Sequence, residues 1–183
     1  MKYFCKKQQT ALQHTNMKKR NIIEKLFGGI LNEFTIHDDF TFTIDNLHRV
    51  KELNNKRLKK KCLDKECNAP DKDSCGVYIF TMKQDGKEIP IYIGCSGKIQ
   101  EGKLTPRKGG MRARICNGKQ KKQKRIDFYI DIMNTKGINQ LKVYWFETGK
   151  RDPEYIEYRL ILQHISRCHE LPEYNNKLVR IEP

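Results

Sequence analysis

The most regular alternation of hydrophobic and polar positions lies in the second half of the chain. Residues 76–83 (GVYIFTMK) are rich in aromatic and β-branched side chains, and residues 91–95 (IYIGC) repeat that composition. Between them, Asp85-Gly86 is a strong turn signal, so we expect an antiparallel hairpin. A third strand is expected at residues 140–148 (QLKVYWFET).

Helices are expected after the hairpin and after the third strand. Residues 111–117 (MRARICN) predict a short helix, and residues 125–136 predict a longer one that ends at Gly137. The last helix begins at Asp152 and Pro153, a pair typical of a helix start. Its apolar residues recur at helical spacing: Ile156, Leu160, Ile161 and Ile165. This order predicts an α+β domain in which helices flank a small antiparallel three-stranded sheet.

The first half of the chain predicts a mainly helical N-terminal extension. Within residues 17–34, apolar residues recur at helical spacing: Ile22, Ile23, Leu26, Phe27, Ile30 and Leu31. Residues 40–44 (FTFTI) alternate like a short strand, and Asp45 suits the start of another helix. A charged run with turn formers follows, and we interpret it as a linker. The predicted division is 1–70 for the extension and linker and 71–183 for the patterned domain.

Charge is the next informative property. The chain of 183 residues contains 37 Lys+Arg and 22 Asp+Glu, a formal net charge of +15. This excess favours a polyanionic partner such as nucleic acid, although a lysine-rich solvated surface gives the same composition. No apolar run approaches the roughly 20 residues that span a bilayer, and the start of the chain lacks the apolar segment of a signal peptide. We therefore expect a cytoplasmic protein with no membrane partner.

Cysteine usage agrees with a reducing compartment. The chain has 7 cysteines, which we interpret as reduced thiols rather than a disulfide framework. Cys62, Cys67 and Cys75 are loosely clustered, but the CLDKEC segment lacks the two-residue spacing typical of zinc sites. The spacing therefore does not favour a zinc site.

Five residue types follow one another in an order that is characteristic of one nuclease family. The expected hairpin carries GVY at 76–78 and YIG at 92–94, one motif on each strand. The next helix carries Arg114, a later helix carries Glu157, and the segment LPEYN near the end supplies Asn175. This succession resembles the GIY-YIG nuclease superfamily.

The resemblance implies a mechanism of phosphodiester hydrolysis. Tyr78 would act as the general base toward water, with Tyr92 as its partner in positioning. Arg114 would contact a non-bridging phosphate oxygen. Glu157 would hold one divalent ion, Mg²⁺ (or Mn²⁺), as a hard carboxylate ligand. Asn175 would organise the site from the C-terminal segment, and the products would carry 5′-phosphate and 3′-hydroxyl ends.

Alternatives stand beside these assignments. Tyrosines on a hairpin are common as ordinary cross-strand aromatics. Each of the other three residues has a neighbour of the same type: Arg112 for Arg114, Glu154 for Glu157 and Asn176 for Asn175. We prefer Arg114 and Glu157 because their spacing to the following apolar residues matches the family pattern.

The resemblance covers about residues 74–178 and departs from the common pattern at two positions. Cys95 stands where many members carry a basic residue. Gly118 stands where many carry a histidine or tyrosine that can help the base. The group that assists Tyr78 is therefore open, and Lys98, if it is partly buried near the site, is our candidate.

Basic residues flank the expected helix of Arg114 on both sides. We predict that these residues contact the phosphates of double-stranded DNA: Arg107, Lys108, Arg112, Lys119, Lys121, Lys122, Lys124 and Arg125. The basic run at 57–61 would only steer the approach of DNA. A charge run is often just a solvated face, so this prediction depends on the position of the run beside the site.

Together, these observations predict a metal-dependent DNA endonuclease, and a small stand-alone enzyme of the restriction type fits the compact chain best. A homing-type or repair-type nuclease is an alternative within the same family. A non-catalytic, basic nucleic-acid-binding protein of the same fold is an alternative from another class. If the target is a palindrome, a homodimer is expected, because one active site cuts one strand.

Overall fold

The computed structural model describes residues 21–53, 70–71, 73–117, 119–120 and 122–176. Predictions for Lys121, Gly118, Cys62, Cys67 and the run 57–61 lie outside these residues. The helices are α2 (Asn21–Leu31), α3 (Ile44–Glu52), α5 (Gly110–Arg112), the π-helix η1 (Ala113–Asn117), α6 (Arg125–Lys136) and α7 (Pro153–Cys168). The strands are β1 (His37–Thr43), β2 (Gly76–Gln84), β3 (Lys87–Ser96), β4 (Lys98–Gln100), β5 (Lys103–Thr105), β6 (Lys119–Gln120), β7 (Gln123–Lys124) and β8 (Gln140–Glu147).

The predicted α+β class is confirmed, but the predicted three-stranded sheet is wrong in strand number. In the described residues the main sheet is antiparallel and has four strands in the order β1-β8-β2-β3. The additional strand, β1, comes from the first half of the chain and pairs with β8, with Phe40 opposite Val143. Pairing with β1 satisfies the free edge of β8, and Phe40 and Phe42 become buried in the core.

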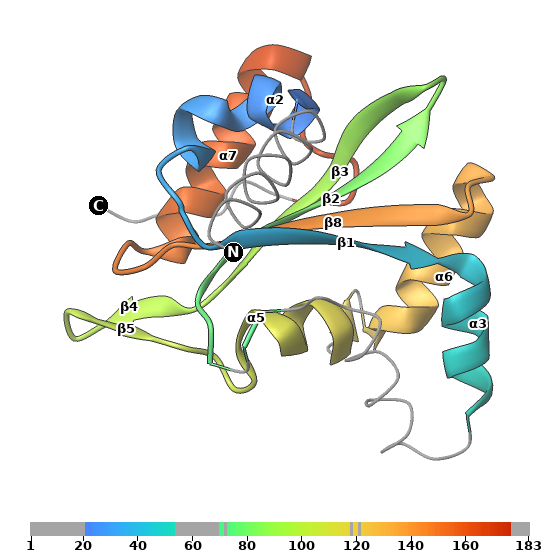
Figure 1. Cartoon of the computed structure of the whole chain (residues 1–183), viewed down its shortest axis with the longest axis horizontal. Helices are drawn as coiled ribbons and strands as arrows, with labels where there is room; N and C mark the ends of the chain where they lie inside the picture. Colours follow the sequence, from blue (N-terminus) through green and yellow to red (C-terminus); the bar gives the residue numbers. More distant parts are fainter. Residues whose placement is uncertain (1–20, 54–69, 72, 118, 121, 177–183) are drawn as a thin grey trace, which may run out of the picture.

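Two hydrophobic clusters lie on opposite faces of the sheet. One face is covered by α2 and α7, whose apolar residues pack on Val77, Ile79 and Ile93. The other face is covered by α3, α5, η1 and α6, and it carries Tyr78 and Phe80 (Figure 1). Described parts of the first half of the chain therefore contribute to both clusters. The division at residue 70 stays a prediction.

Local signals explain the hairpin and most helix ends. Asp85 and Gly86 both have positive φ, at 51° and 75°, as a two-residue type I′ turn requires. The helix expected after residue 44 is confirmed, but its N-cap is Thr43 rather than Asp45. The Thr43 side chain accepts a hydrogen bond from the Asn46 N–H at 3.3 Å. A hydroxyl in extended backbone just before the first helical turn satisfies that donor directly.

The remaining helices also follow their sequence signals. Asp152 caps α7 by accepting from the Glu154 N–H at 3.0 Å, and Pro153 opens the helix. Gly137, in the left-handed region, ends α6. The helix expected at 111–117 is divided, since α5 gives way to the π-helix η1 at Ala113. Among the described residues, no helix is long and apolar enough to cross a membrane.

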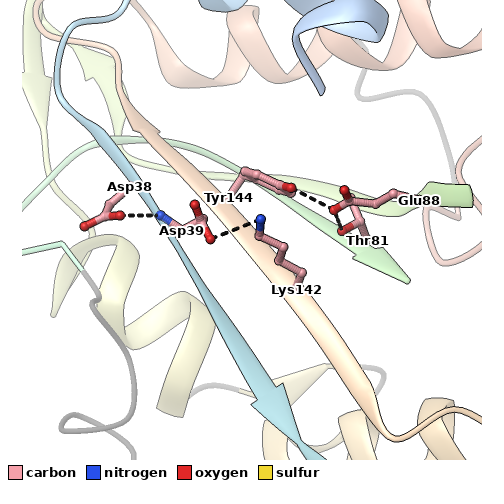
Figure 2. Close-up of polar contacts among 6 residues, drawn as sticks. All are labelled: Asp38, Asp39, Thr81, Glu88, Lys142 and Tyr144. Carbon is pink, nitrogen blue, oxygen red and sulfur yellow. Dashed lines mark hydrogen bonds and ion pairs between the residues drawn. The ribbon is translucent and has the colours of Figure 1, made fainter. Parts of the chain in front are cut away.

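Polar contacts also link the strands of the main sheet, β1, β2, β3 and β8. Glu88 accepts hydrogen bonds from the hydroxyls of Thr81 at 2.5 Å and Tyr144 at 2.8 Å (Figure 2). Lys142 and Asp39 form an ion pair at 3.1 Å on the neighbouring strands. Of these residues, Asp39, Thr81, Glu88 and Lys142 border a hollow of about 570 Å³. None of these residues is a predicted site residue.

Candidate active site

Tyr78 lies at the centre of the candidate site, on β2 between its two neighbouring strands. It is opposite Trp145 of β8 and Gly94 of β3, and its side chain is 0 % exposed. A Cβ placed on Gly94 would come within 2.7 Å of the Tyr78 hydroxyl oxygen and Cζ. The glycine of the YIG motif is therefore needed because the phenol ring lies directly over it.

Tyr92 stands next to Tyr78 on the same face of the sheet. The two ring centroids are 6.1 Å apart and the rings are inclined at 44°. The register of β2 and β3 shifts between Phe80 and Thr81, so Ile91 and Tyr92 both join the cluster that contains Tyr78. Tyr92 is only half-buried, whereas Tyr78 is covered.

Arg114 and Glu157 reach this region from two other elements. Arg114 is half-buried in η1, and π-helical segments are frequent at functional sites. Glu157 lies in the first half of α7 and is 8 % exposed. Both groups act electrostatically on Tyr78, and Arg114 also acts on Glu157. Arg114 is therefore an arginine that acts electrostatically on both residues.

Burial and neighbouring charges have opposing effects on Tyr78. Burial raises the pKa of its phenol well above the usual value, and Tyr92 and Glu157 raise it further. Two cations, Arg125 and Arg114, lower it. In the free protein Tyr78 is consequently protonated at neutral pH, and formation of a phenolate depends on nearby positive charge.

Glu157 sits in a comparable environment. Burial raises the pKa of its carboxyl group, while a hydrogen bond from the Cys95 thiol and the charges of Arg114 and Arg107 lower it. The rival, Glu154, is instead engaged in an ion pair with Arg107 at 2.8 Å. The two glutamates thus differ in their surroundings, since Glu154 forms an ion pair with Arg107 and Glu157 is buried beside Cys95.

Asn175 fastens the C-terminal segment to the edge of the sheet. Its side-chain oxygen accepts from the Ile93 N–H at 2.9 Å, and its side-chain NH₂ donates to the Ile93 carbonyl at 2.8 Å. The neighbouring Tyr174 N–H donates to the Ile91 carbonyl at 2.9 Å. The Asn175 side chain therefore makes the two backbone hydrogen bonds to Ile93, next to Tyr92, that a neighbouring strand would make. Its neighbour Asn176 is exposed.

The predicted phosphate contacts fall into two groups. The exposed members are Arg107, Lys108, Lys119, Lys122 and Lys124. Arg112 is half-buried, and Arg125 is 1 % exposed, so in this structure Arg125 is inside the protein rather than on a phosphate-binding surface. Lys98 is exposed on β4 and lacks the partial burial on which its expected assistance to Tyr78 depended.

A divalent ion would find one hard ligand here, the carboxylate of Glu157. The described residues contain no group of three or more His, Cys, Asp or Glu side chains that could hold a metal. A single carboxylate nevertheless fits Mg²⁺, which commonly retains waters and completes its shell with substrate phosphates. The adjacent Cys95 thiol is a soft ligand and does not suit this ion.

Two contributors were missed by sequence reasoning. Sequence reasoning named Cys95 only as a departure from the family pattern, but its thiol contacts Glu157. Arg125 was assigned to the surface because it ends a run of basic residues. Helical spacing gives a warning, since Phe128, Tyr129 and Ile132 stand three, four and seven positions after it, and all three are buried.

Comparison of the chain with family models, curated proteins and solved structures gives no significant match. The candidate site therefore rests on its own geometry and on the order of its residue types.

Proposed function

We propose that this protein is a metal-dependent DNA endonuclease with a GIY-YIG-like site. One observation carries the proposal: Tyr92, Arg114 and Glu157, from three different elements, all act electrostatically on the phenol of Tyr78 in a fourth. Ordinary cross-strand aromatics do not require a buried glutamate and an arginine beside them. Clusters of titratable groups with shifted pKa values are typical of active sites.

Each residue of the candidate site has a separate role in the proposed phosphodiester hydrolysis. Tyr78 takes the proton of the attacking water, and Tyr92 positions it. Arg114 neutralises charge on the phosphate, which grows in the transition state. Glu157 would hold Mg²⁺ or Mn²⁺, whose charge would stabilise the leaving 3′-oxygen. Asn175 keeps β3 and the C-terminal segment in place around Tyr92.

The substrate that best fits this chemistry is double-stranded DNA. A net charge of +15 favours phosphate binding, and exposed lysines stand on both sides of the Arg114 helix. A restriction-type enzyme is the form we favour, with homing and repair roles as alternatives in the same family. A palindromic target would call for a homodimer.

The burial of Tyr78 favours a second candidate, a nucleic-acid-binding protein of the same fold that does not hydrolyse DNA. The Tyr78 hydroxyl is buried and has no hydrogen-bond partner within the described residues. Water reaches it only when the covering side chains move. Catalysis therefore requires an opening that accompanies substrate binding, and a permanently closed site would leave only the binding function.

Incubation of the full chain with duplex DNA separates the two candidates. With Mg²⁺ or Mn²⁺ the wild type should cut DNA to 5′-phosphate and 3′-hydroxyl ends, and a chelator should stop the reaction. Tyr78→Phe should lower the rate by about 100-fold or more, because a general base contributes at least that much. Tyr155→Phe is the matched control, since Tyr155 is 49 % exposed on α7. DNA that is bound but stays intact with both metals would establish the second candidate.

A further inference from the structure

The strands β4 and β5 form a small two-stranded ribbon that extends away from the main sheet (Figure 1). Its two-residue turn, Glu101-Gly102, has positive φ at both positions, 52° and 72°, as a type I′ hairpin requires. Among the described residues, neither hydrophobic cluster of the main sheet includes Ile99 or Leu104, the apolar pair of the ribbon. The ribbon therefore adds nothing to these clusters, and most of its side chains are exposed.

The pairing of the two strands gives the ribbon a polar face and an apolar face. Lys98 is opposite Thr105, and Gln100 is opposite Lys103. Directly opposite residues share one face of an antiparallel pair, and the next residue along each strand lies on the other face. All four polar residues therefore lie on one face, and the apolar pair lies on the other. The polar face carries two lysines and an exposed amide, all of which can donate hydrogen bonds.

Both ends of the ribbon contact the first turn of α7. Before β4, Gly97 lies against Pro153, because a Cβ at Gly97 would come within 3.3 Å of the Pro153 Cγ. After β5, the guanidinium of Arg107 forms an ion pair with Glu154 at 2.8 Å. Glu157 follows Glu154 on the same helix by three residues, which is about one turn. The ribbon therefore begins and ends beside the helix that carries the proposed metal ligand.

The shape and the chemistry of the ribbon fit the major groove of duplex DNA. That groove is about 12 Å wide and admits a two-stranded β-ribbon, whereas side chains cannot read the narrow major groove of duplex RNA. Gln100 and Lys103 stand next to the turn and would reach deepest into the groove. A glutamine amide suits adenine, a lysine suits guanine, and the carboxylate of Glu101 in the turn can accept from cytosine. Lys98, further from the turn, would reach a phosphate.

We propose that the β4–β5 ribbon enters the major groove of double-stranded DNA and reads base pairs beside the phosphate that is cleaved. Gln100 and Lys103 contact base edges, and Lys98 contacts the backbone. The position of the cut rests on the proposed nuclease function, whereas binding in the groove does not require cleavage. Lys98 thus acts on DNA instead of assisting Tyr78.

Binding of the full chain to a short DNA duplex, with a chelator present so that none is cut, tests the placement of the ribbon. The double variant Lys98→Ala/Lys103→Ala should bind about tenfold more weakly, and its salt dependence should become shallower by about one to two units of slope. Lys83→Ala/Lys87→Ala is the matched control, because it removes two lysines from the exposed end of the β2–β3 hairpin. This control should bind nearly as the wild type does, and equal losses in the two double variants would overturn the inference.

Duplex RNA of the same sequence distinguishes groove reading from simple attraction to phosphate. The two double variants should bind this RNA equally, since the ribbon cannot enter its major groove. A loss of RNA binding that is confined to Lys98→Ala/Lys103→Ala would show a phosphate contact only and would overturn the inference.

Selection of bound duplexes from a pool of random DNA sequences tests the base contacts. The wild type should enrich a short motif, and Gln100→Ala should lose about tenfold of the preference at an adenine while it still binds random DNA. Gln84→Ala, at the exposed end of β2, is the matched control and should select the wild-type motif. An identical motif for Gln100→Ala, or no motif for the wild type, would refute base reading by the ribbon.

The cleavage assay separates this inference from the proposed nuclease function. A wild type that binds and selects DNA through the ribbon but cuts none with Mg²⁺ or Mn²⁺ refutes the nuclease function and leaves groove binding standing. A wild type that cuts DNA, while the ribbon variants bind and select as it does, refutes the ribbon inference alone.

Discussion

At the residue scale, the site depends on the close fit between Gly94 and Tyr78. The two residues are opposite each other on β3 and β2, and the phenol ring fills the space that a side chain at position 94 would need. Tyr78 is also the residue on which Arg125, Arg114 and Glu157 act. A small change at Gly94 therefore alters the position of the phenol relative to all its charged neighbours.

Gly94→Ala should displace Tyr78 and destabilise the protein by about 1–3 kcal/mol, the usual range for overpacking a core. The added Cβ would lie 2.7 Å from the Tyr78 hydroxyl, and the backbone on both sides is held in the ladder. Chemical denaturation measures the stability, and the cleavage assay measures the activity, which should fall more than stability alone explains.

Gly29→Ala is the matched control. Gly29 is exposed in α2, and a Cβ there meets nothing within 4 Å. Because alanine is the better helix former, this variant should be equal to the wild type or more stable by up to about 1 kcal/mol. Equal stability and equal activity of Gly94→Ala and Gly29→Ala would contradict the role given to Gly94.

The candidate site residues are predictions from the sequence, and each of them is tied to a short motif or a helix signal. Tyr78 and Tyr92 follow from the hairpin pattern, and Glu157 follows from the well-marked α7. Arg125 was predicted to lie on the surface because basic residues precede it, although the apolar residues that follow it at helical spacing are buried. Whether a charged side chain at a helix start turns inward depends on tertiary packing, which the local pattern does not fix.

At the element scale, the edge strand β3 is completed by the C-terminal segment. Asn175 makes two hydrogen bonds to the Ile93 backbone, and Lys136 of α6 holds Glu173 at 2.7 Å. Phe128 and Tyr174 pack edge to face with ring centroids 5.7 Å apart. These contacts link the segment to both β3 and α6, the elements that carry Tyr92 and Arg125.

Asn175→Ala should lower the free energy of unfolding by about 1–3 kcal/mol, because it leaves both polar groups of the partly buried Ile93 backbone without partners. Hydrogen exchange should show faster exchange at the Ile93 amide. Asn176→Ala, one residue further along and exposed, is the matched control and should behave as the wild type does. Slow exchange at Ile93 in Asn175→Ala would disprove the fastening role.

At the scale of elements, the strands could be predicted from the sequence, but the pairing partner of β1 could not. The hairpin and β8 could be predicted from β-branched and aromatic composition with turn signals. The strand nature of residues 40–44 was also predicted, but nothing in an alternating pattern says which free edge a strand will join. The position of β1 beside β8 is set by long-range pairing, with a charged segment of the chain lying between them in sequence.

At the scale of the whole molecule, the sheet separates two layers, and each of them carries candidate site residues. Arg114 and Arg125 belong to η1 and α6 on one side of the sheet, whereas Glu157 belongs to α7 on the other. Glu157 is kept in a poorly solvated position, so burial raises the pKa of its carboxyl group. A raised pKa means that the ionised form costs stability, a common feature of functional sites.

Glu157→Gln tests the account's central claim most directly, with Glu154→Gln as the matched control. Near neutral pH the free protein should gain stability in Glu157→Gln, and the gain should vanish below the pKa that the carboxyl has in the unfolded chain. Mg²⁺ should stabilise the wild type thermally but not Glu157→Gln.

The deciding measurement is the single-turnover rate of duplex cleavage with Mg²⁺ by wild type, Glu157→Gln and Glu154→Gln. The account predicts a loss on the order of 100-fold or more for Glu157→Gln with DNA affinity retained, and near-normal cleavage by Glu154→Gln. Normal cleavage by Glu157→Gln, or no cleavage by a folded wild type that binds DNA, would contradict it.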